Sequence, residues 1–418
     1  MHKSVEPHPS WGRRLGGIEG LRAIAAISVL AYHVGLTASE QVHLGPIGQI
    51  ILPLLGQGLP LFFVLSGFLL FRPFAASIMG EKALPSIRRY ITNRLLRIYP
   101  VYLVVFTLTA LVMGSVYLKG STHGLGPDNI GRLTEPIKFL ANALLVHMFF
   151  PQFVMSGLPV AWSLTAEITF YVVVPLIALA AVGLANKGVN KVLALAAAPV
   201  AMVAIGLGVT FWGDAASSNM DYAARVDFAF GQTASAVLLR SFLGQADLFA
   251  YGMAVAIVVA FLDQHRLQRV ATMIKVALVL AAIAVVWGGV ASMSHLSNLM
   301  GIASAIILLA VVLPSSRTRG INRLAVALEW LPIRFTGTIS YSIYLWHLPV
   351  IFWLMAHKLT VGESALALPF NVVLVLGIVL PLSALTYFAV ERPAMMWKKP
   401  TQIVAASPSE TRVTAPVS

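Results

Sequence analysis

Long apolar runs constrain the fold of this chain more than any other feature of its sequence. Several runs hold 18 or more mostly apolar residues, which is enough to cross a hydrocarbon core about 30 Å thick. Only 11% of the 418 residues are charged, whereas a soluble domain carries about 25%. Lipid leaves backbone groups unsatisfied outside helices and closed barrels, and the short alternating segments of barrel strands are missing. The sequence therefore predicts an all-α, polytopic transmembrane helical bundle.

Charge counting predicts the number of spans and their orientation. With the N-terminus inside, the inner segments hold 22 Lys and Arg residues and the outer loops hold 6. If the short apolar segment 137–150 also crossed, the counts would become 12 inside and 16 outside. Because basic residues favour cytoplasmic loops, we expect both termini in the cytoplasm and segment 137–150 to be re-entrant or interfacial. The ten expected spans lie near residues 18–38, 48–71, 98–118, 160–183, 192–213, 241–262, 274–290, 298–314, 337–357 and 367–390.

The chain divides into a cytoplasmic N-terminal arm (1–17), a membrane domain (18–399) and a tail (400–418) that we expect to be disordered, because it has no apolar period. The sequence contains no cysteine, which excludes disulfides and a thiolate nucleophile. The net charge of +13 follows from basic cytoplasmic loops, so no nucleic-acid partner is expected. No metal site or permanently bound cofactor is expected either.

Arg22 and His33 lie inside the first apolar run, although a bilayer disfavours both side chains. Eleven residues bring the helix to within about 20° of three full turns and advance it by roughly 16 Å. Both side chains therefore share one helix face, which should line the bundle interior or a wet cavity. Taken singly, Arg22 is also explained by snorkelling to headgroups, and His33 by a hydrogen bond between helices.

Further charged side chains suggest catalysis and phosphate binding. Glu167 lies about as deep in its predicted span as His33 does, so a carboxylate–imidazole pair is expected, as a general base requires. The alternative is a purely structural hydrogen bond of Glu167 to His33 or to Trp162. Arg94 and Arg97 share a helix face and suit phosphates, although a basic cluster beside a span also serves topology or anionic lipid.

Together these residues resemble the acyltransferase-3 family of bacterial inner-membrane acyltransferases. Arg22 and His33 match the family's first-helix motif of Arg, ten residues and His, and Arg94 and Arg97 match its Arg-x-x-Arg pattern. The other matching segments follow in the family's order: "LFFVLSGFLL" (61–70), "WSLTAEITFYVVVPL" (162–176), "SYSIYLWHLPV" (340–350) and "ERP" (391–393).

The resemblance implies an acyl-CoA-dependent transferase of groups other than aminoacyl groups, in the bacterial cytoplasmic (inner) membrane. It would move an acyl group, commonly acetyl, from cytoplasmic acyl-CoA to a hydroxyl of a carbohydrate, glycolipid or secondary metabolite. Some family members carry an extra extracytoplasmic domain, so a second transfer step would need a separate partner here.

Each candidate residue has an expected role in this mechanism. We expect His33 to act as general base with Glu167 orienting it, and Arg22, Arg94 and Arg97 to bind acyl-CoA. The expected substrate pocket comprises Trp162, Tyr171, Ser66, His347 and Asp247. Ser66 is also a candidate acyl carrier, His347 suits a helix bridge equally well, and Asp247 is more simply a solvated helix cap.

A secondary transporter or exporter is the rival interpretation, because intramembrane Arg, His and Glu also build proton relays. The sequence shows no internal repeat of the inverted kind that many transporters carry. A membrane scaffold without catalysis is a third class.

Overall fold

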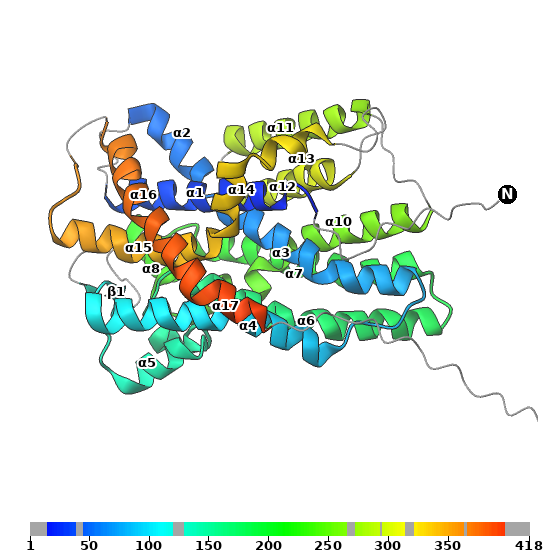
Figure 1. Ribbon diagram of the computed structural model, residues 1–418, viewed down its shortest axis with the longest axis horizontal. Coiled ribbons are helices and arrows are strands. Elements are labelled where there is room, and N and C mark those ends of the chain that lie inside the picture. The colour runs from blue at the N-terminus through cyan, green and yellow to red at the C-terminus, as the bar shows by residue number, and fades with distance from the viewer. Residues whose placement is uncertain are drawn as a thin grey trace, which may run out of the picture.

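A computed structural model describes residues 15–38, 45–119, 129–265, 272–292, 295–313, 322–362 and 366–397. Within these ranges the protein is almost entirely helical (Figure 1). One antiparallel pair of two-residue strands, β1 (Val116–Tyr117) and β2 (Ile130–Gly131), is the exception. The predicted all-α fold is confirmed. The tail (400–418) and all but residues 15–17 of the N-terminal arm (1–17) lie outside the described residues.

The helices, with short 3-10 and π segments marked η, follow one another along the chain. Figure 1 shows the long ones running roughly along one direction. They are α1 (Ile18–Thr37), α2 (Gly45–Leu55), α3 (Gly58–Met79), α4 (Ile87–Thr107), η2 (Leu108–Met113), α5 (Pro136–Ala143), η4 (His147–Phe149), η5 (Pro151–Phe153), α6 (Ala161–Asn186), α7 (Lys191–Ser217), α8 (Tyr222–Phe230), α9 (Ala234–Arg240), η6 (Leu243–Gln245), α10 (Ala246–Gln264), α11 (Thr272–Ser292), α12 (Leu296–Val312), α13 (Arg323–Leu328), α14 (Leu331–Thr338), α15 (Ser340–Ala356), α16 (Ala367–Thr386), η7 (Tyr387–Glu391) and α17 (Arg392–Met396).

Eight helical segments in the described part of the chain are long and apolar enough to cross a membrane. A ninth span arises if α14 and α15, which are bent by 71° at their junction, are counted together. The remaining predicted span, 298–314, corresponds to α12, which has only 17 residues. All ten predicted spans therefore correspond to helices, although eight or nine have full crossing length. The cytoplasmic location of both termini stays a prediction.

The connection before α6 is packed into the bundle. The short apolar segment 137–150 forms α5, of eight residues, and the turn η4, which is too short for a crossing. Leu145, Val154 and Leu158 in this connection are buried, and Ala161 at the start of α6 is fully buried as well. The first turn of α6 therefore begins inside the protein.

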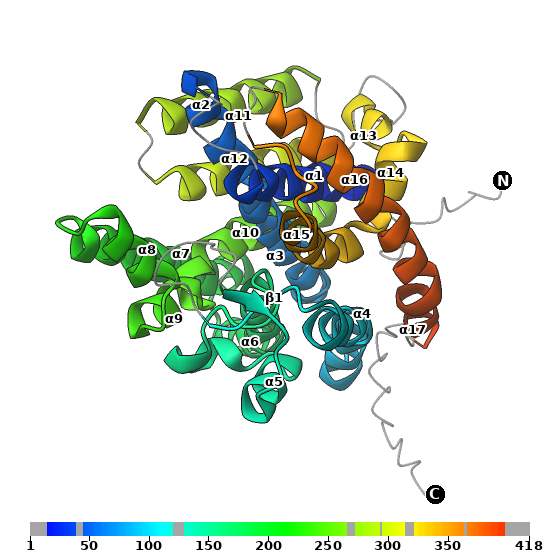
Figure 2. The same ribbon diagram turned by 90° about the vertical axis from the view of Figure 1, so that its left-hand side faces the viewer.

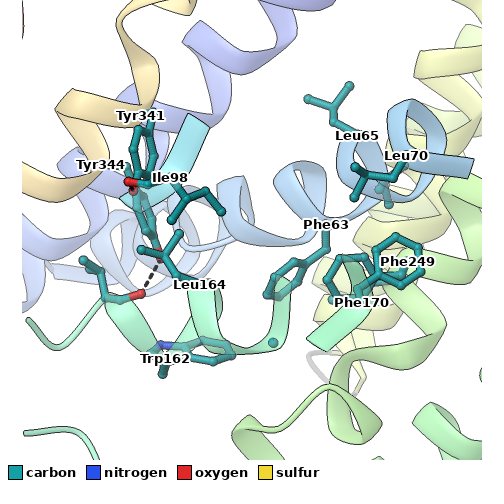
Figure 3. Close-up of a cluster of buried hydrophobic side chains, with 14 of the residues drawn as sticks. Phe63, Leu65, Leu70, Ile98, Trp162, Leu164, Phe170, Phe249, Tyr341 and Tyr344 are labelled. Carbon is teal, nitrogen blue, oxygen red and sulfur yellow. Dashed lines mark hydrogen bonds between the residues drawn. The ribbon is translucent and has the colours of Figure 1, made fainter. Parts of the chain in front are cut away.

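Helices α3 and α10 pack backbone against backbone in the core. A Cβ atom at Gly67 would lie 2.1 Å from the Phe249 carbonyl oxygen, and one at Gly252 would lie 2.0 Å from that of Val64. Glycine at both positions lets the two backbones touch, as small residues do between membrane helices. Beside this contact the rings of Phe249 and Phe63 lie tilted to each other, with centroids 4.7 Å apart (Figure 3).

Helices α3, α10 and α15 lie near the middle of the bundle in the end-on view (Figure 2). Nearly every residue of α15 is buried. Most polar side chains on α15 therefore form hydrogen bonds inside the protein, and some of them help to build the site described next.

Candidate active site

A cavity of about 100 Å³ lies between α1, α3, α4, α6 and α15, with room for several water molecules. Part of its wall is apolar, and part is made by polar side chains. Six predicted site residues line it: Arg22, Ser66, Arg94, Arg97, Glu167 and Tyr171. We call it the inner cavity. Residues that are far apart in the sequence thus meet at one place, as expected of a site inside a helical bundle.

A second cavity, of about 500 Å³, adjoins the inner cavity. Arg22 and Arg97 line both cavities, so these two guanidinium groups stand at the junction. We call the second space the vestibule, and Glu19, Arg334 and Glu391 contribute to its wall. Glu391 is the last residue of the π segment η7, and such segments often occur at functional sites. At the junction, the two cations Arg22 and Arg97 therefore lie between the larger vestibule and the smaller inner cavity.

Glu167 is held by two hydroxyl groups in the inner cavity. Ser66 Oγ and Tyr171 OH each donate to Glu167 Oε1, both at 2.9 Å. No hydrogen bond joins Glu167 to His33 in the part of the chain that the structure describes, so the predicted pairing of these two residues is wrong. The prediction counted the depth of Glu167 from the outer end of its span, and so assumed that α6 starts at the outer surface. Because α6 starts inside the protein, Glu167 lies deeper, within electrostatic reach of Arg22.

His33 instead contacts a second histidine. His347 Nε2 on α15 lies 3.2 Å from His33 Nδ1, and the two ring centroids are 5.0 Å apart. His33 Nδ1 also lies 2.9 Å from the carbonyl oxygen of Val29, and His347 Nδ1 lies 3.3 Å from that of Ile343. His347 is buried and His33 half-buried. The first helix thus turns His33 towards the bundle and Arg22 towards the cavities, as the shared face predicts.

These contacts fit one tautomer of both rings. If each Nδ1 carries the hydrogen, His347 Nδ1 donates to the Ile343 carbonyl oxygen, and the single His33 Nδ1–H is shared between the Val29 carbonyl oxygen and the lone pair of His347 Nε2. His33 Nε2 then keeps a free lone pair. This atom makes no hydrogen bond to any residue that the structure describes. The arrangement leaves His33 Nε2 ready to accept a proton.

Tyr344 connects the histidine pair to the inner cavity. Its side chain lines the cavity, and its ring centroid lies 5.7 Å from that of His347. The hydroxyl group of Tyr344 shares a 2.8 Å hydrogen bond with Ser163 Oγ, which fixes the ring (Figure 3). His33 and His347 do not line the cavity themselves, so they lie one aromatic ring beyond it.

Asp247 does not belong to this site. Its buried carboxylate accepts a 2.8 Å hydrogen bond from Asn298 Nδ2 on α12. A Cβ atom at Gly206 on α7 would lie 2.6 Å from Asp247 Oδ1, so helix backbone packs directly against the carboxylate. Neither the inner cavity nor the vestibule is lined by Asp247. The structure corrects the expectation of a substrate contact, because the start of α10 faces α7 and α12 at this point.

The sequence profile of the acyltransferase-3 family, described as an acyltransferase domain, matches residues 15–388. The chain belongs to the acyltransferase-3 family. The family match covers all helices that build the inner cavity and the histidine pair, which confirms the resemblance drawn from the motifs. It makes the chain a membrane protein of an acyltransferase family, so the transporter interpretation loses its support.

Curated relatives of this acyltransferase-3 chain carry names from different biological settings. The candidate peptidoglycan O-acetyltransferase YrhL of Bacillus subtilis (strain 168) is 25% identical over 416 residues, which cover 94% of this chain and 56% of the relative. Acyltransferase MdmB of Streptomyces mycarofaciens is 29% identical over 39% of each chain. Nodulation protein 10 of Rhizobium leguminosarum bv. viciae is 30% identical over 38% of this chain and 42% of the relative.

The matches thus cover about half, or less, of the length of each of these curated relatives. No solved structure matches the chain. The sequence profile therefore establishes the family of the chain. The names of the relatives do not point to one common acceptor.

Trp162 lies beside the site of this acyltransferase-family chain rather than in its cavities. Its ring contacts Phe63, a residue of the cavity wall, with centroids 6.1 Å apart. The guanidinium group of Arg240 lies over the ring of Trp162, with its central carbon 5.3 Å from the ring centroid. Arg240 is not among the predicted site residues, although the sequence carries one signal for it. It is one of only six Lys and Arg residues assigned to the outer loops, and it directly precedes a predicted span.

Proposed function

We propose that this protein is an integral-membrane O-acyltransferase that uses cytoplasmic acyl-CoA, with acetyl-CoA as the principal donor. The protein lies in a bacterial inner membrane. The acceptor is a hydroxyl of a carbohydrate, a glycolipid or a secondary metabolite. The observation that carries the proposal is the order of groups along α1. Arg22 stands where the vestibule meets the inner cavity, and His33, with its open Nε2, lies further along the same helix beside His347.

The vestibule is the proposed entrance for the nucleotide end of acyl-CoA. Guanidinium groups bind phosphates through paired, charge-assisted hydrogen bonds, and Arg22 and Arg97 offer two such groups at the junction. Arg94 lines the inner cavity beside them. The pantetheine arm, which is uncharged, then extends along the leucine side chains of the inner cavity towards Tyr344. This orientation places the vestibule on the cytoplasmic side, in agreement with the predicted topology.

His33 is the proposed general base. The acceptor hydroxyl gives its proton to His33 Nε2 while its oxygen attacks the thioester carbonyl carbon. The carbon–sulfur bond breaks, and the CoA thiolate leaves with the proton from the His33 imidazolium. His347 Nε2 accepts the hydrogen bond of His33 Nδ1–H and so stabilises the imidazolium and holds the ring, which makes His347 a positioning residue. A general base in place contributes about 10²- to 10⁴-fold to the rate.

Ser66 is the alternative acyl carrier. Its hydroxyl group donates to Glu167, a geometry that would let the carboxylate assist proton removal. We favour direct transfer, because the open histidine nitrogen lies beyond Tyr344 and away from Ser66. In direct transfer Ser66 and Tyr171 position Glu167, and Glu167 keeps the cavity arginines oriented.

The proposal is tested with full-length protein purified in detergent and with cells that have or lack it. Mass spectrometry of surface glycans, lipids and secreted metabolites should show one product class that gains a single acyl mass only when the protein is present. The purified protein should release free CoA from acetyl-CoA when that acceptor is added. Absence of the mass shift together with absence of CoA release would contradict the proposed function.

A further inference from the structure

Arg240 lies near two aromatic rings at the end of α9, just before the span that begins at Leu243. Its guanidinium carbon lies 3.8 Å from the ring centroid of Phe230 and 5.3 Å from that of Trp162. Its Nε donates to the Ala229 carbonyl oxygen at 3.2 Å. Aromatic faces attract a cation without neutralising it, so the side chain is fixed and keeps its charge.

No carboxylate from the described residues forms an ion pair with Arg240. This contrasts with Arg22, which has Glu19, Glu167 and Glu391 within electrostatic reach. Burial lowers the pKa of Arg240 to about 10, so the group remains a cation at neutral pH. A half-buried cation without a counter-charge is costly, and an anionic ligand would offset that cost.

Arg240 also lies close to the proposed catalytic pair. It interacts electrostatically with Tyr32, whose ring centroid lies 5.2 Å from that of His33. Tyr32 and Arg22 are ten residues apart on α1, which is about 15 Å along the axis. The bundle therefore has two cationic sites along α1, Arg22 and Arg97 at one end and Arg240 at the other, with the histidine pair next to the second.

We propose that Arg240 binds an anionic group of the acyl acceptor, a carboxylate or a phosphate near the hydroxyl that receives the acyl group. The inference rests on the proposed function and narrows its acceptor class. One cationic site takes the phosphates of the donor, and the other takes the charge of the acceptor. In this proposal Trp162 and Phe230 hold the guanidinium group, and its outer nitrogens bind the anionic group.

The test starts with the acceptor isolated from cells that have the protein, identified by its extra acyl mass. Its neutral form is prepared by methyl esterification of a carboxylate or by phosphatase treatment of a phosphate, which also tells the two sources apart. With purified full-length protein, neutralisation should lower kcat/KM by about 10- to 100-fold, as loss of a hydrogen bond to a charged group does. In Arg240→Met, kcat/KM for the charged acceptor should fall by the same factor, and neutralisation should then have no further effect.

Arg225→Met is the matched control, because Arg225 is an exposed arginine of the same outer segment. It should leave the preference for the charged acceptor intact. The KM for acetyl-CoA should stay unchanged in both variants. An isolated acceptor without any anionic group, or a charge preference that survives in Arg240→Met, would overturn the inference. Complete absence of acyl transfer in the wild type would instead overturn the proposed function.

Discussion

Glu167 and Asp247 are both carboxylates inside the helical bundle, but their surroundings differ. Glu167 is half-buried, accepts two hydroxyl hydrogen bonds, and borders a cavity that three arginines also line. Asp247 is 1% exposed, is bonded to Asn298 and is pressed against the backbone at Gly206. The two acids therefore differ in whether space adjoins them. Glu167 faces the inner cavity, whereas Asp247 is enclosed by α7, α10 and α12.

The largest expected effect comes from removing the proposed base, His33, near the inner cavity that Glu167 borders. His33→Ala should lower kcat for acyl transfer by about 10²- to 10⁴-fold, because the acceptor hydroxyl loses its proton acceptor. Acetyl-CoA binding, measured by titration, should be unchanged. His357→Ala, at an exposed histidine after α15, is the control and should keep full activity. A His33→Ala protein with nearly normal kcat would show that the histidine pair is structural.

A second, smaller effect is expected at the junction of the two cavities. Arg97→Met keeps most of the side-chain length but removes the guanidinium group, so the KM for acetyl-CoA should rise by about 10- to 100-fold. Arg88→Met, at an exposed position of the same helix, is the matched control. Equal effects of the two substitutions on KM would mean that the basic cluster acts only through topology or lipid.

A third substitution separates direct transfer from an acyl-serine intermediate. Ser66→Ala removes one of the two hydroxyl donors to Glu167, and direct transfer predicts a loss of only about 3- to 10-fold, because Tyr171 still donates to the carboxylate and Ser66 takes no part in the chemical step. Intact-protein mass spectrometry after incubation with acetyl-CoA should show no acetyl adduct on the wild type. Complete loss of transfer, together with an acetylated Ser66 in the wild type, would establish the acyl-serine route.

The smallest effect on activity is expected at Asp247, which is packed between α7, α10 and α12. Asp247→Asn keeps the shape of the side chain and one acceptor for Asn298, so acyl transfer should change by less than about twofold. The free energy of unfolding should fall by about 1 kcal/mol, because a charge-assisted hydrogen bond becomes a neutral one. Denaturant unfolding in detergent and the transfer assay measure the two quantities side by side. A large loss of transfer without a loss of stability would return Asp247 to the active site.

The sequence predicted those parts of the site that depend on helical periodicity. Arg22 and His33 both face into the bundle, and Arg94 and Arg97 line the same cavity, because the spacing within one helix determines its faces. Contacts between helices were not predictable in this way. His347 is 314 residues from its partner His33, and the depth of Glu167 depended on a buried connection that hydropathy does not reveal. Arg240 was missed because its partners are aromatic rings from other segments.

The most direct test of the account is a structure of the full-length protein with a non-reactive acetyl-CoA analogue, in which a methylene group replaces the thioester sulfur and the acetyl carbonyl is kept. The account predicts the phosphates of the analogue at Arg22 and Arg97, the pantetheine arm in the inner cavity, and the acetyl carbonyl beyond Tyr344 beside His33 Nε2. An acetyl carbonyl at the Ser66–Glu167 pair, or phosphates bound away from both arginines, would contradict it.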